Sequence, residues 1–492
     1  MDLGPVVRAL NTHGILPVVS TDELATDVHN RAKALSKKDA AFKYRKRPRP
    51  VSVDFNYGIS IRPVDVLREL GVATTFFTRN PFTEAARLWA HTRYCGTLET
   101  NHQGLLILSQ DAEDVVFHHK TAQSEQLGIG FALLIAKKVL NDWYPDFEFQ
   151  VVDADVALSA GFIETIGRIQ QDHRTKMRPD YFLVGHRTGK EGSAMVVVLE
   201  CKGTHKTRHF ATGQLAKASI QVETVPIGNQ TPRAIMVATL LEQSGITAFV
   251  LDPPGIDDLW SGDDEQLDDL LAQQPENLAL TPRLPSAEEF RARQDLLAET
   301  EDYIEPLLQP APKLTKEVSE LVEPPPAGLP EIFPIPERRR SWFLQVLARS
   351  AATSTLLYAG DAANARSYAT QQRGLSVEQK AIGQQSLFDD EAGAEQAIDA
   401  GTAWSSFRLN KDLAFEGTRY TIPVPGRQFL EVCRGVERNV YAQLEQGHIG
   451  GYWRQAKIFW ERWSGWTPTT STNDAVSLGR DGTALTVRII DS

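Results

Sequence analysis

Three observations on the sequence predict an α/β fold. Short apolar segments alternate with longer, helix-like segments over residues 115–252, which is typical of strands packed between helices. The composition, 42% hydrophobic and 23% charged residues, is that of a globular protein. No apolar run approaches the roughly eighteen residues of a membrane-spanning helix. At 492 residues the chain is long enough for two or three domains.

We expect residues 1–110 to form a mixed α/β module. Its apolar segments predict strands at residues 15–19, 51–55 and 104–108, and its helical periodicity predicts helices at residues 63–70 and 83–92.

Within this module, residues 31–50 form a basic arm with nine Lys and Arg against one Asp. The aromatic residues Phe42 and Tyr44 lie among these charges, a mixture that favours phosphate contacts and base stacking. A solvated basic linker is the alternative interpretation. The side chains that we assign to nucleic-acid binding are those of Lys43, Arg45, Lys46, Arg47 and Arg49.

Residues 111–255 carry the alternating pattern of the core. The expected elements, in chain order, are a strand at 115–119, a helix at 122–143, a strand at 147–152, a helix at 160–171, strands at 181–185 and 194–199, a helix at 213–224, and strands at 234–241 and 247–251. The turn-prone residues 186–193 predict that the two middle strands form a hairpin with a long loop.

The hairpin determines which side chains face each other. Its midpoint lies between Gly189 and Lys190, so facing positions should sum to about 379 or 380, which places Asp180 opposite Leu199 or Glu200. The β-carbons of such a pair lie about 4.5–5.5 Å apart. Because side chains alternate along a strand, Glu200 and the lysine two positions later share a face, and Cys201 points to the other.

Two facing carboxylates repel each other unless a cation lies between them or one stays protonated. A divalent ion such as Mg²⁺, which prefers oxygen ligands, suits the gap between Asp180 and Glu200. With the Lys202 ammonium group beside it, the cluster can position a water and stabilise the charge on a phosphate under attack. These residue types therefore predict phosphodiester hydrolysis.

Asp180 after a proline, followed by Glu200-Cys201-Lys202 at the end of an apolar strand, resembles the signature of the PD-(D/E)xK nuclease superfamily. The resemblance implies a restriction-endonuclease-like core, a mixed sheet flanked by helices, over about residues 115–252. It also implies that Asp180 and Glu200 bind Mg²⁺, with Mn²⁺ as a substitute, and that Lys202 activates or orients the attacking water. The alternative is a structural ion pair between Glu200 and Lys202, with Asp180 capping a turn.

Two further residues fit places that members of this superfamily use. Many members have an acidic residue on the helix before the first core strand, and Glu125 fits that place; a role near the helix N-terminus is its alternative. Some members have a glutamine on the helix after the lysine, which Gln214 matches. RecB-like members add a tyrosine four positions later, where this chain has Ala218.

The remaining residues predict a linker and a second domain. Residues 256–305 hold fifteen Asp and Glu against three Lys and Arg, and proline recurs up to residue 336, so we expect residues 256–336 to form an acidic, then proline-rich linker. We expect residues 337–492 to form a mainly helical domain. Within it, Gln384, Leu387 and Phe388 resemble the pentapeptide that binds the bacterial sliding clamp; a disordered loop is the alternative.

The three cysteines, far apart and odd in number, argue for a reducing cytoplasm, and the start of the chain does not resemble a signal peptide. The sequence thus predicts a cytoplasmic, Mg²⁺-dependent nuclease that acts on DNA, in restriction, antiviral defence or DNA repair. The alternatives are a non-cleaving nucleic-acid-binding adaptor that keeps the nuclease fold, and a nuclease directed at RNA. A homodimer stays open as the assembly state.

Overall fold

A computed structural model of the protein describes residues 3–38, 46–75, 92–158, 178–189, 192–228, 230–273, 335, 337–369, 402–424, 428–466 and 474–491. None of the helices in these ranges is both long and apolar enough to cross a membrane. The α-helices are α1 Gly4–Asn11, α2 Asp22–Lys38, α3 Pro63–Ala73, α5 Gln110–Glu113, α6 Phe117–Trp143, α8 Arg208–Gln221, α9 Asp264–Ala272, α12 Arg340–Ala359, α13 Ala362–Tyr368, α15 Arg438–Glu445 and α16 Ile449–Trp463.

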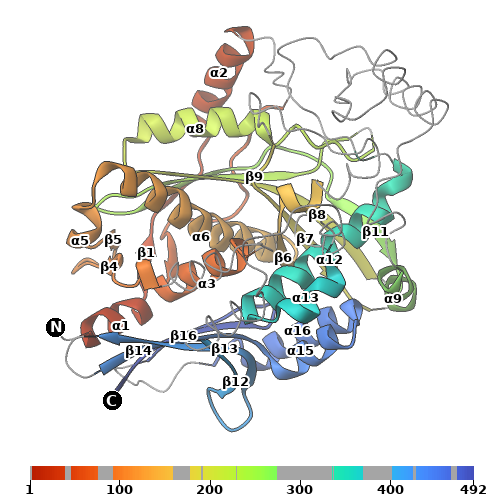
Figure 1. The fold of residues 1–492 in the computed structure, drawn as a ribbon. Helices are drawn as coiled ribbons and strands as arrows, with labels where there is room; N and C mark the ends of the chain where they lie inside the picture. The colour runs from red at the N-terminus through yellow and green to blue at the C-terminus, as the bar shows by residue number, and fades with distance from the viewer. Residues whose placement is uncertain are drawn as a thin grey trace, which may run out of the picture.

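A seven-stranded mixed sheet lies at the centre of the fold, in the order β2-β10-β9-β8-β7-β6, with β11 paired to the start of β8 (Figure 1). The pairs β8–β9 and β10–β2 are parallel and the others are antiparallel. The α/β class and the mixed sheet flanked by helices are therefore confirmed. The strands are β2 Val18–Val19, β6 Glu148–Asp153, β7 Tyr181–Arg187, β8 Gly192–Thr204, β9 Ala234–Leu240, β10 Thr247–Leu251 and β11 Asp258–Gly262.

Alternating side chains bury both faces of this sheet. Leu183 and Val197 belong to the apolar cluster that contains α6, whereas Phe182 and Val198 belong to the cluster that contains α8 and α12. The sheet therefore has an α6 face and an α8 face. Strands buried on both faces read as continuous apolar runs, which explains why residues 194–199 are all apolar.

The longest helix, α6, forms because its apolar residues recur at every fourth position. Leu127, Phe131, Ile135 and Val139 are all at most 1% exposed, and they form one stripe against the sheet. The helix ends before Tyr144, whose following proline disfavours helical backbone. The helix begins at residue 117, so the predicted strand at 115–119 is wrong: its last three residues form the first turn of α6.

The described residues among the first 110 pack onto the central sheet. Strand β2 joins the sheet beside β10, α3 packs against α6, and α2 packs against α8 (Figure 1). Of the predicted strands, 15–19 and 104–108 correspond to β1, β2 and β5, and the predicted helix at 63–70 is α3. The predicted strand at 51–55 is wrong: residues 52 and 53 form a bend, and the Val51 amide donates to Ser20 Oγ (2.9 Å) instead of to a neighbouring strand. The short strands are β1 Gly14–Leu16, β3 Ile59–Ile61, β4 Leu98–Thr100 and β5 Leu106–Leu108.

The C-terminal region contains a five-stranded antiparallel sheet, in the order β12-β13-β14-β16-β15, so the expectation of a mainly helical domain is wrong. Residues 431–446 have helical periodicity, but the chain stays extended to Glu437 because β14 pairs with both β13 and β16. The Glu437 carboxylate then accepts hydrogen bonds from the amides of Asn439 (2.9 Å) and Val440 (3.1 Å), which starts α15. The strands are β12 Thr402–Arg408, β13 Ala414–Val424, β14 Gln428–Glu437, β15 Asp474–Leu478 and β16 Thr483–Asp491.

The predicted linker begins later than residue 256. Residues 258–262 form β11 on the central sheet, and α9 follows. The physical reason is burial: Leu259, Leu267 and Leu271 are at most 3% exposed, so this acidic stretch has an apolar side that packs on the core. Residues 274–334, most of the predicted linker, lie outside the described residues, as do the predicted helix at 160–171 and all but the last residue of the predicted helix at 83–92.

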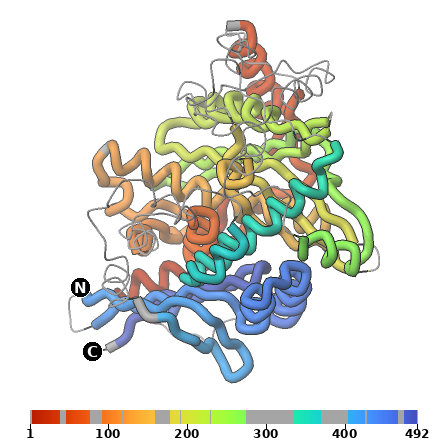
Figure 2. Tube along the Cα trace, turned by 45° about the vertical axis from the view of Figure 1, so that its right-hand side comes forward, coloured from red at the N-terminus to blue at the C-terminus, as the bar shows by residue number. Residues whose placement is uncertain are grey.

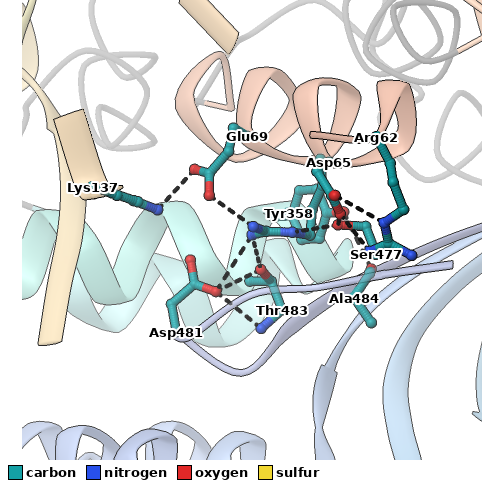
Figure 3. Close-up of polar contacts among 10 residues, drawn as sticks. Arg62, Asp65, Glu69, Lys137, Tyr358, Ser477, Asp481, Thr483 and Ala484 are labelled. Carbon is teal, nitrogen blue, oxygen red and sulfur yellow. Dashed lines mark hydrogen bonds and ion pairs between the residues drawn. The ribbon is translucent and has the colours of Figure 1, made fainter. Parts of the chain in front are cut away.

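The C-terminal sheet docks through a buried ionic network (Figure 3). Arg68 of α3, 4% exposed, donates to Ser477 Oγ (2.9 Å) and Thr483 Oγ1 (3.1 Å) of the β15–β16 hairpin. Its guanidinium group also pairs with Glu69 (2.7 Å), and Glu69 pairs with Lys137 of α6 (2.7 Å). Three elements far apart in the sequence therefore meet at one set of charges.

Arg68 keeps its charge in this buried position. Burial alone would lower the pKa of Arg68, but the carboxylates of Glu69 and Asp481 more than offset burial and raise it. The Asp481 carboxylate lies 3.8 Å from the guanidinium group and accepts a hydrogen bond from the Thr483 hydroxyl (2.6 Å). Removing one partner from such a network leaves the others charged and uncompensated.

We expect Arg68→Met to lower the free energy of unfolding by about 3–5 kcal/mol, because Glu69 and Asp481 would stay buried after losing one of the two cations, Arg68 and Lys137, that compensate them. Chemical denaturation followed by circular dichroism measures the change. The matched control is Arg438→Ala, since Arg438 pairs with Glu416 at an exposed site (2.9 Å) and should lose at most about 1 kcal/mol. Equal losses in the two variants would show that the network does not stabilise the fold.

Helix α16 packs onto the central sheet through a buried histidine. The rings of His186 on β7 and Trp453 on α16 stack with centroids 4.2 Å apart and planes 11° apart. Trp453 also donates to Gln150 Oε1 on β6 (2.9 Å). Burial, aided by the charge of Lys457, lowers the pKa of His186 to about 3, so the imidazole stays neutral in the folded protein at physiological pH.

This burial predicts a pH dependence of stability. The unfolded chain protonates His186 near its ordinary pKa of 6.5 and the folded chain only near 3, so stability is lost as the pH falls below 6.5. The loss contributed by this residue should reach about 2 kcal/mol at pH 5. In His186→Phe, which keeps a ring against Trp453, the difference in unfolding free energy between pH 7.5 and pH 5 should shrink by that amount. An unchanged difference would mean that His186 is not the group responsible.

Candidate functional site

The hairpin of β7 and β8 brings Asp180 and Glu200 together. Tyr181 faces Leu199 in the observed register, so facing positions sum to 380, which is one of the two predicted registers. One step further, the Asp180 amide donates to Glu200 Oε2 (3.0 Å). The two carboxylates therefore lie side by side where β7 begins and β8 approaches its end.

Lys202 completes a cluster of three charged side chains. Its ammonium group pairs with Glu200 Oε1 and lies 3.6 Å from Asp180 Oδ2. The side chain of Glu200 is fully buried, whereas those of Asp180 and Lys202 are 34% and 21% exposed. Asp180 Oδ2 also accepts a hydrogen bond from the Cys201 amide (2.8 Å). The cluster thus extends from the fully buried Glu200 to the partly exposed Asp180.

Electrostatic coupling is strong in this cluster. Burial, followed by the charge of Asp180, raises the pKa of Glu200 well above its ordinary value, and Lys202 opposes that rise. Burial opposes the charge on Lys202, but the carboxylates of Glu200 and Asp180 more than offset it and raise the pKa of the ammonium group. Lys202 is therefore a permanent cation at neutral pH, and the two carboxylates depend on nearby positive charge.

Glu200 and Lys202 lie on the α8 face of the sheet. Met236, the cross-strand partner of Glu200, belongs to the apolar cluster of that face, whereas Cys201 and its partner Val237 belong to the cluster on the α6 face. The predicted alternation of these three positions is therefore confirmed.

Helix α8 runs beside the strands that carry the site. Gln214 Nε2 donates to the Gly203 carbonyl next to Lys202 (3.4 Å), and Gln221 Nε2 donates to the Arg178 carbonyl, two residues before Asp180 (3.1 Å). Gln214 thus lies near the site, as predicted, but its observed hydrogen bond is to the protein backbone.

Helix α6 touches the same strand from the opposite face. A β-carbon added at Gly203 would lie 1.7 Å from the Ser124 carbonyl oxygen, and one added at Gly128 would lie 2.9 Å from the Gly203 α-carbon. Only glycine at both positions lets the backbones of α6 and β8 approach this closely. The packing holds the end of β8 directly after Lys202.

Glu125, also on α6, is exposed, and its charge contributes to the raised pKa values of Tyr94 and Tyr181, for which burial is the main cause. The structure does not gather Glu125 into one metal-binding group with Asp180 and Glu200: among the described residues, no three or more His, Cys, Asp or Glu side chains form such a group.

Asp153 is an acidic neighbour of the site that sequence reasoning missed. It ends β6, faces Tyr181, and accepts a hydrogen bond from the Val156 amide (3.1 Å). Burial raises the pKa of its carboxyl group, with a further contribution from Asp180. An aspartate directly after the predicted strand at 147–152 was the available signal, but only the pairing of β6 with β7 brings it near Asp180.

The donor set fits a hydrated divalent ion. Mg²⁺ keeps several waters and is usually held by one or two carboxylates, which Asp180 and Glu200 can supply. The same two carboxylates are neutralised by Lys202 in this structure, so a bound cation would compete with the ammonium group for them.

The described part of the basic arm packs on the protein. The Lys46 amide donates to Glu223 (2.8 Å) and its ammonium group to the Thr231 carbonyl (3.2 Å), and Arg47 donates to Thr26 Oγ1 (3.3 Å). Arg49 exchanges backbone hydrogen bonds with Asp252. Lys46 therefore anchors the arm, and the Arg47 and Arg49 side chains are exposed.

The other residues that the sequence predicts to bind nucleic acid or a sliding clamp lie outside the described residues, namely Lys43, Arg45, Gln384, Leu387 and Phe388.

Comparisons of the chain with protein-family models, with curated proteins and with solved structures found no match.

We expect Gly203→Ala to destabilise the protein by about 1–3 kcal/mol or more, because the Ser124 carbonyl cannot yield to a β-carbon and α6 must move away from β8. Thermal unfolding measures the loss. The matched control is Gly245→Ala, where an added β-carbon meets nothing within 4 Å. Gly203→Ala melting at the control's temperature would show that the close approach is not required.

Proposed function

We propose that this protein is a metal-dependent nuclease of the PD-(D/E)xK type that hydrolyses phosphodiester bonds in DNA. The observation that supports it best is the convergence of Asp180, Glu200 and Lys202 at one partly open point. A structural ion pair needs one carboxylate and one cation. A second carboxylate held against the first costs stability unless it serves a purpose such as binding a cation.

Asp180 and Glu200 would hold Mg²⁺, which when bound polarises the phosphate and lowers the pKa of a water. The two residues contribute differently to metal binding. Glu200 would hold the ion from the buried side, and Asp180, which is 34% exposed, would hold it on the side open to substrate. Lys202, released from the carboxylates, orients the attacking water and stabilises the negative charge on the phosphate oxygens. Its raised pKa suits this role as a cation better than a role as a base.

One observation favours the second candidate, a non-cleaving nucleic-acid-binding protein. Lys202 already neutralises both carboxylates, and among the described residues no three His, Cys, Asp or Glu side chains form a group that could hold a metal. A protein that kept the fold for binding alone would retain such a balanced cluster.

Cleavage assays separate the two candidates. Purified protein is incubated with supercoiled plasmid, linear duplex, single-stranded DNA and RNA, with Mg²⁺ or with EDTA. We expect Mg²⁺-dependent cleavage of DNA by the wild type, and a loss of at least about 100-fold in Asp180→Asn, because a neutral amide binds a hard cation poorly. The amide oxygen can still accept the hydrogen bond from Cys201, so the variant should fold.

The matched control is Asp142→Asn, which removes an exposed aspartate paired with Lys138 on α6 and should cleave like the wild type. Plasmid nicking would indicate internal cutting. Equal turnover in Asp180→Asn and the wild type would overturn the assignment of the site, and binding without cleavage by the wild type would favour the second candidate. RNA as the better substrate would move the proposal from DNA to RNA.

A further inference from the structure

The start of α8 presents an exposed surface that the proposed chemistry does not use. We call it the α8 entry surface and define it by Lys206, Arg208, Phe210 and the α2 residue Arg31. Residues 206–210 are all exposed. Arg31 joins them because its guanidinium group contacts both the ring of His209 (3.0 Å) and its backbone carbonyl (3.1 Å).

An exposed aromatic ring lies at the centre of this surface. Phe210 is 39% exposed, in a protein whose phenylalanines at positions 131, 182, 249, 343 and 415 are at most 2% exposed. The Lys206 ammonium group lies 4.2 Å from the centroid of the Phe210 ring. A cation beside an exposed ring combines the two groups that hold a nucleotide: one for its phosphate and one for its base.

The charge around the ring is entirely positive along this stretch of chain. Residues 203–222 contain Lys206, Arg208 and Lys217 and no Asp or Glu. Of the described acidic groups, Asp27 pairs with Arg31 (2.9 Å), and the charge of Glu113 acts on His205, the residue directly before Lys206. The charge of this stretch is positive, whereas the formal net charge of the whole chain is −11. The surface therefore favours a polyanion.

The surface lies on the side of the sheet that carries Glu200 and Lys202. Arg208 contacts the ring of Phe249, which belongs to the apolar cluster on the α8 face. Phe210 and Gln214 are one helical turn apart, and Gln214 contacts Gly203, the residue after Lys202. Figure 2 shows α2 and α8 together at one end of the molecule, with the C-terminal sheet at the other.

We propose that the α8 entry surface binds single-stranded DNA and leads it into the Asp180–Glu200–Lys202 site. Lys206 and Arg208 contact the phosphates, and Phe210 stacks on an unpaired base. The proposal rests on the proposed nuclease function. Single strands are favoured over duplex because the bases of a duplex are stacked on one another, so a lone ring has no exposed base face to cover.

Binding assays without metal test the proposal independently of cleavage. Fluorescence anisotropy in EDTA measures the Kd for a labelled single strand, for the same sequence as a duplex, and for an RNA strand. We expect Phe210→Ala to weaken single-strand binding about tenfold, with duplex binding changed less than about twofold. Phe210→Trp should restore binding. The matched control is Tyr57→Ala, which removes an aromatic ring that is 91% exposed elsewhere on the surface.

Lys206→Ala and Arg208→Ala should each weaken binding at low salt and reduce its salt dependence. Single-strand binding that is the same in Phe210→Ala and the wild type, or weakened equally by Tyr57→Ala, would overturn the proposal. Tighter binding of RNA than of DNA would overturn the assignment to DNA. A wild type that binds single strands through Phe210 but cleaves nothing with Mg²⁺ would overturn the nuclease function and leave the binding surface standing.

Discussion

The structure of the site depends on one constraint: the register of the β7–β8 hairpin forces Asp180 and Glu200 side by side. Glu200 is fully buried, so its carboxylate cannot be screened by water, and the neighbouring Asp180 adds repulsion. Lys202 follows on the same face of β8 and supplies the compensating charge. A slip of one residue would turn Glu200 and Lys202 to the opposite face of the sheet and would break the cluster. The hydrogen bonds from the Asp180 amide to Glu200 (3.0 Å) and from the Cys201 amide to Asp180 (2.8 Å) oppose such a slip.

The rest of the fold holds this hairpin end from three sides. Helix α6 packs its backbone against β8 through Gly128 and Gly203, and α8 donates hydrogen bonds through Gln214 to β8 and through Gln221 to the segment before β7. The third contribution is less direct. The C-terminal sheet is tied to α3 and α6 through the buried charges around Arg68 (Figure 3). These contacts explain why segments far apart in the sequence form one continuous body in the described residues.

The two proposals assign different tasks to neighbouring parts of the α8 face. The Asp180–Glu200–Lys202 site is partly buried and carries the groups proposed to react, whereas the start of α8 is exposed and carries the Phe210 ring and the Lys206 ammonium group. Part of the basic arm, which the sequence pointed to first, is used internally: Lys46 bonds to Glu223 and Thr231. A run of basic residues therefore locates positive charge in a sequence, but it does not show which of those charges stay free to meet a phosphate.

Local pattern was sufficient to determine the α/β class, the long helix α6, the hairpin and the grouping of Asp180, Glu200 and Lys202, because strand alternation and loop length act over a few residues. Local sequence pattern did not predict the secondary structure correctly where contacts with residues distant in the sequence determine it. Residues 431–437 have helical periodicity but become a strand between β13 and β16, and the acidic residues after 256 join the central sheet because β8 offers them an open edge. The meeting of Arg68 with Asp481 and the nearness of Asp153 to Asp180 likewise follow only from tertiary packing. No short-range spacing encodes them, since each depends on which elements the whole chain brings into contact.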